Sequence, residues 1–198
     1  MRNLPELTRA LAAAAVLFAF VAPVRAQTKT PDPPLKRTID LSAGYTYLHA
    51  NAPPGGCGCF SMNGGSASAA FGVTPSLSVA ADLGVTHAGN ILNSTETLTL
   101  TTYLFGPRYT QRSHMGRVLP YGQILLGAAH SASNFVLNNG GNGFSMMTGG
   151  GVDLPINKHF AWRVVQVDYL LTRIPNSASN TQNNLRVTTG LVYRFDRR

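Results

Sequence analysis

The chain has 198 residues, of which only 12% are charged, with 20 glycines, 12 prolines and a net charge of +8. A water-soluble domain averages about 25% charged residues, so something other than water should cover part of this surface. The basic residues form no cluster with aromatics, which speaks against a nucleic-acid partner. The length is that of one domain.

The first 26 residues have the pattern of a secretory signal peptide. Arg2 and Arg9 accompany an apolar run over residues 10–22, and Val24-Arg25-Ala26 suits a cleavage site. An uncleaved anchor is the alternative, but a spanning helix needs about 20 apolar residues. Cleavage would leave 198 − 26 = 172 residues, with 13 Lys and Arg against 7 Asp and Glu. The sequence therefore predicts export through the periplasm.

Residues 27–36 (QTKTPDPPLK) read as a short, Pro-rich periplasmic tether. From residue 37 to residue 198 the chain is expected to form one domain. It contains eight runs in which apolar and polar residues alternate, and a period of two indicates β-strands. The predicted strands are residues 38–49, 65–73, 76–87, 95–109, 117–131, 143–154, 159–173 and 185–195.

One face of each predicted strand is apolar, and we expect it to face lipid. Leu98, Leu100 and Leu104 are assigned to the outside of the fourth strand, opposite Thr99, Thr101 and Tyr103. The register of this strand beyond Gly106-Pro107 is left open. Leu100, Leu126 and Val167 are expected near the middle of the bilayer.

The connections between the predicted strands alternate in length. The first, third, fifth and seventh are long and polar, the second and sixth are short and contain proline, and the fourth is intermediate. Long extracellular loops and short periplasmic turns are typical of outer-membrane barrels. The prolines at 75, 107, 120 and 155 all fall at predicted periplasmic ends, where a missing backbone donor does least harm. The pattern predicts an all-β fold, an eight-stranded antiparallel up-and-down transmembrane barrel.

Three further segments resemble a known group of proteins. They are Leu119-Pro120-Tyr121-Gly122-Gln123, Gly149-Gly150-Gly151-Val152-Asp153 and Val167-Asp168-Tyr169. Together with the eight strands, they make residues 37–195 similar to small outer-membrane β-barrels of the OmpA/OmpX type. The resemblance implies a location in the outer membrane of a Gram-negative bacterium, in contact with lipid and lipopolysaccharide. Members of this group mostly lack an assigned activity.

The last predicted strand resembles the C-terminal signal of outer-membrane proteins. The matching residues are Thr188, Gly190, Tyr193 and Phe195, although Asp196-Arg197-Arg198 follow the usual terminal aromatic. The resemblance implies that the outer-membrane assembly machinery recognises this strand.

The polar faces should line the lumen. An eight-stranded barrel is just filled by its own side chains, and an unpaired charge there is costly. We therefore expect a lumenal ion-pair network, with a gated ion path as the alternative. Its predicted members are Asp40, Asp82, Asp153, Asp168, Arg186 and Arg194, with Gln166 also in the lumen and Arg108 as a further candidate.

Other candidate chemistry is sparse. Cys57 and Cys59 lie in the first long loop, where an exported protein could form a disulfide, although a CxC ring is strained and two thiols remain the alternative. His130 and Ser133 resemble the base and nucleophile of a barrel-borne lipid hydrolase, but a period of two puts them on opposite faces. No residues with metal-ligand spacing are visible, and we expect no cofactor.

The sequence thus predicts a non-enzymatic, monomeric outer-membrane barrel with a structural or surface-interaction role. Three alternatives remain: a narrow channel for ions or small solutes, a lipid-modifying barrel enzyme, and a secreted soluble barrel of the lipocalin kind. The lipocalin alternative would place the apolar face inside, and it gives no reason for aromatic residues at the end of the last strand.

Overall fold

The computed structural model describes residues 37–50, 59–89, 91, 95, 97–111, 118–135, 138–175 and 181–197. The predicted signal peptide and tether, residues 1–36, lie outside the described residues, and so does Cys57. No helix in the described part of the chain is long and apolar enough to cross a bilayer.

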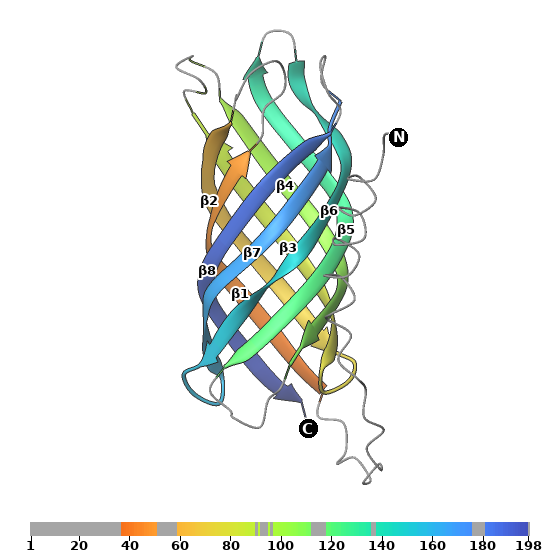
Figure 1. Cartoon of the computed structure of the whole chain (residues 1–198), viewed down its shortest axis with the longest axis vertical. Helices are drawn as coiled ribbons and strands as arrows, with labels where there is room; N and C mark the ends of the chain where they lie inside the picture. Colours follow the sequence, from red (N-terminus) through yellow and green to blue (C-terminus); the bar gives the residue numbers. More distant parts are fainter. Residues whose placement is uncertain are drawn as a thin grey trace, which may run out of the picture. The chain divides into compact units, whose positions relative to one another are not determined.

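Eight antiparallel strands close into a barrel (Figure 1). Each strand pairs with the next, and β8 pairs with β1 from Arg37↔Arg197 to His49↔Leu185. The predicted eight-stranded, up-and-down order is confirmed. The strands are β1 (Arg37–Ala50), β2 (Phe60–Gly72), β3 (Leu77–Ala88), β4 (Leu98–Thr110), β5 (Leu119–Phe135), β6 (Asn138–Pro155), β7 (Phe160–Arg173) and β8 (Gln182–Arg197).

The barrel begins and ends at the same rim, here called the terminal rim, where β1 starts and β8 stops. The tight β2–β3 and β6–β7 turns lie at this rim, and each is closed by backbone bonds such as Val73 N–H to Leu77 O (2.8 Å). In the β6–β7 turn, the Asn157 side chain accepts from the N–H groups of His159 and Phe160, both at 2.8 Å. The turn residues therefore match the predicted periplasmic connections.

The fifth connection, predicted as a long polar loop between residues 131 and 143, is strand for most of its length, so this prediction is wrong. β5 continues to Phe135 and β6 begins at Asn138, with Ala132 paired to Gly140 and a register irregularity between Ala132 and Phe135. Gly141 N–H also donates to Ser131 Oγ at 3.1 Å. Asn and Gly adopt a strand here because the neighbouring strand satisfies their backbone groups. As a result the β4–β5 connection is longer than the β5–β6 connection, and the predicted alternation fails at this place.

The predicted facing of β4 is also wrong. Leu100 and Leu104 are 7% and 3% exposed and point into the barrel, whereas Tyr103 and Phe105 are 55% and 66% exposed. The register does not shift at Gly106-Pro107, since Phe105 pairs with Leu126 and Arg108 with Gln123 on the same diagonal. Arg108 therefore lies on the same face as the two leucines.

The interior has two parts, an observation that the sequence reading did not anticipate. The half near the terminal rim is polar, with charged side chains from six strands. The half toward the other rim, called the loop rim, holds uncharged side chains. Its larger apolar ones include Leu48, Met62, Leu100, Met147, Leu170 and Ile174, and its buried polar ones include Thr86, Ser145, Thr172 and Asn184. An eight-stranded barrel has an interior of about one side-chain layer, and both halves are occupied in this way.

Candidate functional site

The most buried ion pair of the lumen joins β8 to β3. Arg186 Nη1 donates to Asp82 Oδ1 at 2.7 Å and its Nη2 to Asp82 Oδ2 at 3.2 Å. Both side chains are 2% exposed. In the closed strand order β8 and β3 are separated by β1 and β2, so this bidentate pair spans the lumen. Bidentate Arg–carboxylate pairs have a fixed geometry, and the bond therefore holds two walls of the barrel together.

A second buried pair joins Arg163 on β7 to Asp153 on β6, through Nε–Oδ1 at 2.9 Å and Nη2–Oδ2 at 3.2 Å. Arg163 Nη1 also donates to Ser42 Oγ and to Gln166 Oε1. The sequence reading missed Arg163, because a register shift between Arg163 and Gln166 turns both residues inward. A strict period of two puts an odd-numbered residue of this strand outside. A bulge leaves no clear signal in the sequence.

A third pair joins β8 to β1 close to the terminal rim. Arg194 Nε and Nη2 donate to the two oxygens of Asp40, both at 2.8 Å. This pair is more exposed than the other two, with 17% and 21% of the two side chains accessible. All three pairs include residues predicted for the lumen.

Asp168 behaves differently from the other predicted acids. No described Arg or Lys contacts its carboxylate, which instead accepts from Gln166 Nε2 at 2.6 Å and Gln123 Nε2 at 3.3 Å. Gln123 Oε1 in turn accepts from Arg108 Nε at 2.9 Å. Gln123 therefore bridges an acid and a base that do not touch.

Tyr121 lies between two guanidinium groups. The Cζ atoms of Arg108 and Arg163 are each 4.8 Å from the ring centroid, and the Tyr121 hydroxyl donates to Gln166 Oε1 at 2.6 Å. Cations are attracted to an aromatic face most strongly where water is excluded. The ring thus attracts both cations.

Two glycines of β6 allow β5 side chains to reach β7. Gly149 separates Gln123 from Asp168, and Gly151 separates Tyr121 from Gln166. A Cβ at Gly151 would lie 2.7 Å from the Tyr121 hydroxyl oxygen, and a Cβ at Gly149 would lie 2.6 Å from Asp168 Oδ1. Side chains at these positions would block both bonds.

The described lumen is electrically balanced. Four arginines stand against four aspartates: Arg108, Arg163, Arg186 and Arg194 against Asp40, Asp82, Asp153 and Asp168. Two buried guanidinium nitrogens, Arg108 Nη2 and Arg186 Nε, have no hydrogen-bond partner. The other contacts of the three buried guanidiniums are to carboxylates, glutamine amides, the Ser42 hydroxyl, the Met147 sulfur and the Tyr121 ring.

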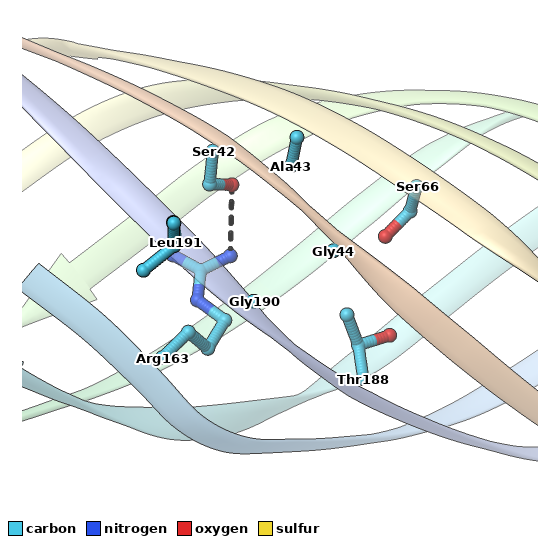
Figure 2. A pocket seen from close by; sticks show the side chains of 8 residues that line it. All are labelled: Ser42, Ala43, Gly44, Ser66, Arg163, Thr188, Gly190 and Leu191. Atoms are coloured by element: carbon cyan, nitrogen blue, oxygen red, sulfur yellow. Dashed lines mark hydrogen bonds between the residues drawn. The ribbon is translucent and has the colours of Figure 1, made fainter.

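Two small hollows lie beside this network. A hollow between β1 and β8 has a volume of about 10 Å³, about the space that one water molecule requires. Figure 2 shows Arg163 bonded to Ser42 on one side of it and Thr188 and Ser66 on the other. A second hollow of the same volume lies near the terminal rim, lined by Asp40 and the β2–β3 turn.

The C-terminal residues singled out in the sequence divide between the two faces of β8. Thr188 is buried and its hydroxyl lies 3.0 Å from that of Thr46. Gly190 pairs directly with Gly44 of β1. Tyr193 and Phe195 point outward and pack edge to face, 4.4 Å between centroids. These last two belong to an aromatic cluster at the terminal rim.

The remaining predicted residues form no site in the described chain. Cys59 is exposed just before β2. His130 points outward and its Nδ1 lies 2.7 Å from Asn142 Oδ1, whereas Ser133 falls on the opposite face of β5. The described residues contain no group of three or more His, Cys, Asp or Glu that could hold a metal ion.

The outside of the barrel is covered with large apolar side chains. A soluble fold would bury them, and here they form the outward face of every strand. Among the most exposed are Tyr103, Phe105, Ile124, Leu191, Phe71 and Tyr109.

No family model and no curated protein matches the chain, but solved structures do. Ail, the attachment invasion locus protein of Yersinia pestis, has a TM-score of 0.57 at 17% identity, over 81% of this chain and 100% of Ail. Neisserial surface protein A has a TM-score of 0.58 at 14% identity, over 79% of this chain and 97% of its own. OprG of Pseudomonas aeruginosa has a TM-score of 0.53 at 13% identity, over 82% of this chain and 98% of the OprG chain.

At these identities the likeness concerns the fold. A further structure of Ail contains the heparin analogue sucrose octasulfate. The closed order of eight strands, the outward apolar band and the similarity to these structures show that the chain has the fold of a small eight-stranded outer-membrane β-barrel.

Proposed function

We propose that the protein is a closed, non-enzymatic barrel with a structural or surface-interaction role in the outer membrane. The observation that carries this proposal is the Arg186–Asp82 pair, which crosses the lumen with both side chains 2% exposed. A conducting path would have to break this pair, and separating a buried pair costs about 3–5 kcal/mol. The large apolar side chains toward the loop rim, such as Leu48 and Met147, add a second barrier to hydrated ions.

The proposed partners are outer-membrane lipid and lipopolysaccharide. The outward apolar band supports the first, and the second is supported by Ail, whose structure with sucrose octasulfate contains a polyanionic sugar. We also propose that the chain acts as a monomer and that the assembly machinery inserts it by reading β8. Residues 1–26 would direct its export.

Single-channel recording in planar bilayers tests the closed lumen. Wild-type protein should show no stepwise conductance, and Arg194→Gln, near the terminal rim, should behave in the same way. Stepwise conductance by folded wild-type protein would overturn the closed lumen and support the narrow channel instead. Heat-modifiable mobility on a gel should accompany each recording, so that only folded barrels are compared.

A further inference from the structure

One residue of β7 is passed over in the pairing with both neighbouring strands. On the β6 side, Val152 pairs with Val165 and Asp153 with Arg163, and Val164 between them has no counterpart. The register with β8 shifts at the same place. Two residues of one strand opposite one of its neighbour make a β-bulge, and the ladder is locally disrupted at a bulge.

This bulge keeps the correct side chains on each face of β7. Arg163 is 3% exposed and lies in the lumen, whereas Trp162 is 46% exposed and points outward. Strict alternation back from the buried Gln166 would reverse this, with Trp162 and Phe160 inside and Arg163 toward lipid. A charged side chain on the lipid face is destabilising, and the interior of an eight-stranded barrel is just filled by its own side chains. The lumenal network therefore requires the bulge.

The hydroxyl of Thr189 contacts the bulge from the outward face of β8. Its Oγ1 donates to the carbonyl oxygen of Arg163 at 3.0 Å, and this carbonyl belongs to the peptide that joins Arg163 to Val164. In the pairing with β8, Thr189 is the single residue that stands opposite the two residues of the bulge. Hydrocarbon contains no water that could replace a missing backbone bond. The Thr189 hydroxyl thus supplies a donor where the ladder is disrupted.

We propose that Thr189 is a positioning residue for the lumenal network, because its hydroxyl fixes the β7 bulge and thereby holds the Arg163 guanidinium in place. From this position Arg163 donates to both carboxylate oxygens of Asp153, to Ser42 on β1 and to Gln166. One hydroxyl on the outside of the barrel then determines contacts of β7 with β6 and β1 on the inside. The inference goes beyond the proposed function and holds whether or not the lumen conducts ions.

Exchange of the Arg163 Nε–H proton with water tests the proposal, measured by NMR on isotope-labelled barrel in detergent micelles. Thr189→Val keeps the size of the side chain but removes the hydroxyl. It should raise this exchange rate about fivefold, the value of one ordinary hydrogen bond. Thr189→Ser keeps the hydroxyl and should exchange like wild type. The Arg108 Nε–H, which is bonded to Gln123, is the internal reference and should not change in either variant.

Thr148→Val is the matched control. Thr148 lies on the outward face of β6, and its cross-strand partners Ile124 and Tyr169 pair with it in regular register. The substitution removes the same hydroxyl from the lipid-facing surface without a bulge opposite it. Exchange at Arg163 should therefore stay at the wild-type rate.

A second background removes the bulge itself. Deletion of Val164 would bring Val165 opposite Thr189 and leave Arg163 opposite Gly190, so that each side chain keeps its face. The ladder would then be regular and would not need the hydroxyl. Thr189→Val should therefore change the Arg163 exchange rate in the natural chain and have no effect in the deletion background. This double-mutant comparison isolates the coupling between the hydroxyl and the bulge.

Unchanged exchange at Arg163 in Thr189→Val would overturn the proposal. An equal rise at Arg163 and Arg108 would also overturn it, because that result would show a general loss of stability. So would an effect of Thr189→Ser as large as that of Thr189→Val, which would assign the role to packing and not to the hydroxyl. An effect of Thr189→Val that persists in the deletion background would disprove the coupling to the bulge.

Each variant is first shown to be folded by its mobility in cold detergent. If the deletion variant does not fold, the comparison of valine and serine at position 189 still decides the outcome. The exchange measurement is also independent of the conductance experiment, since a conducting barrel would overturn the closed lumen and leave the role of Thr189 unaffected.

Discussion

Arg186 bonds Asp82 across the lumen, although Asp168 stands beside it on the neighbouring strand. Asp168 and Arg186 are direct cross-strand partners of β7 and β8, yet the guanidinium extends to β3. The two glutamine amides that occupy Asp168 explain this arrangement, since they satisfy its carboxylate without a base. Arg186 is thereby left to join distant walls of the barrel.

Removing the Asp82 carboxylate should destabilise the folded barrel strongly. Asp82→Asn leaves Arg186 buried without a charge partner, which costs about 3–5 kcal/mol. Asp40→Asn is the matched change at the more exposed pair and should cost less, because water reaches both side chains of that pair. Unfolding by increasing concentrations of guanidinium chloride in detergent, followed by gel mobility, measures the free energy of unfolding of each variant. Equal costs would mean that the pair across the lumen contributes no more than the one at the rim.

Filling the glycine positions of β6 should disturb the bonds between β5 and β7. Gly151→Ala brings a Cβ to 2.7 Å from the Tyr121 hydroxyl oxygen, and such overpacking costs about 1–3 kcal/mol. Gly122→Ala is the control, because its Cβ would meet only Gly149 O at 3.8 Å. The same unfolding titration should show a loss for the first variant and almost none for the second. The added Cβ would also lie 2.6 Å from Val165 O, so a neutral Gly151→Ala would show that both the Tyr121 side chain and the backbone of β7 have room to move.

Lipid contact should follow the facing seen in the structure. Labels at positions 105 and 126 should be quenched by brominated lipid tails, and a label at position 100 should be protected, since Leu100 points inward. Leu126→Arg should cost about 2–4 kcal/mol in lipid. Equal quenching at positions 100 and 126 would mean that Leu100 faces lipid, as the sequence predicted, and not the lumen.

Phe195 and Phe160 allow the proposed assembly signal to be separated from simple packing. Both rings are 44% exposed, and both meet Tyr193 edge to face, with centroids 4.4 and 4.9 Å away. Phe195→Ala and Phe160→Ala should therefore lower detergent-refolded stability to a similar extent. Only Phe195→Ala should also reduce the heat-modifiable protein in the outer-membrane fraction. Equal insertion of the two variants would count against recognition of β8.

The sequence predicted the architecture well because the period of two survives in almost every strand. It failed in β4, where both faces carry apolar groups: leucines on one and Tyr103 and Phe105 on the other. Arg108 is separated from Leu100 and Leu104 by an even number of residues and so shares their face of the strand. This could have indicated that the leucines point inward, because a charged residue in a barrel belongs in the lumen. It was not used because the sequence left the register beyond Gly106-Pro107 open. The structure shows that the register continues through these two residues.

Arg163 and the β5–β6 segment escaped prediction for other reasons. A bulge between Arg163 and Gln166 reverses which residues of β7 face the lumen, and no residue of β7 near the bulge indicates its presence. The Asn- and Gly-rich residues 138–143 have low strand propensity, but their pairing with β5 overrides it. Pairings that depend on side-chain reach, such as Arg186 with Asp82, need the three-dimensional strand order and do not follow from alternation.

Strand β8 also supplies half of the positive charge of the described lumen. Arg186 and Arg194 both lie on β8, and their partners, Asp82 and Asp40, lie on β3 and β1. Before β8 is in place, the described lumen would hold four carboxylates and only two guanidiniums, a net charge of −2 with nothing to neutralise it. A seven-stranded intermediate in lipid would therefore be electrostatically unfavourable. Arrival of the final strand removes this imbalance, so the same residues that fill the barrel also favour its closure.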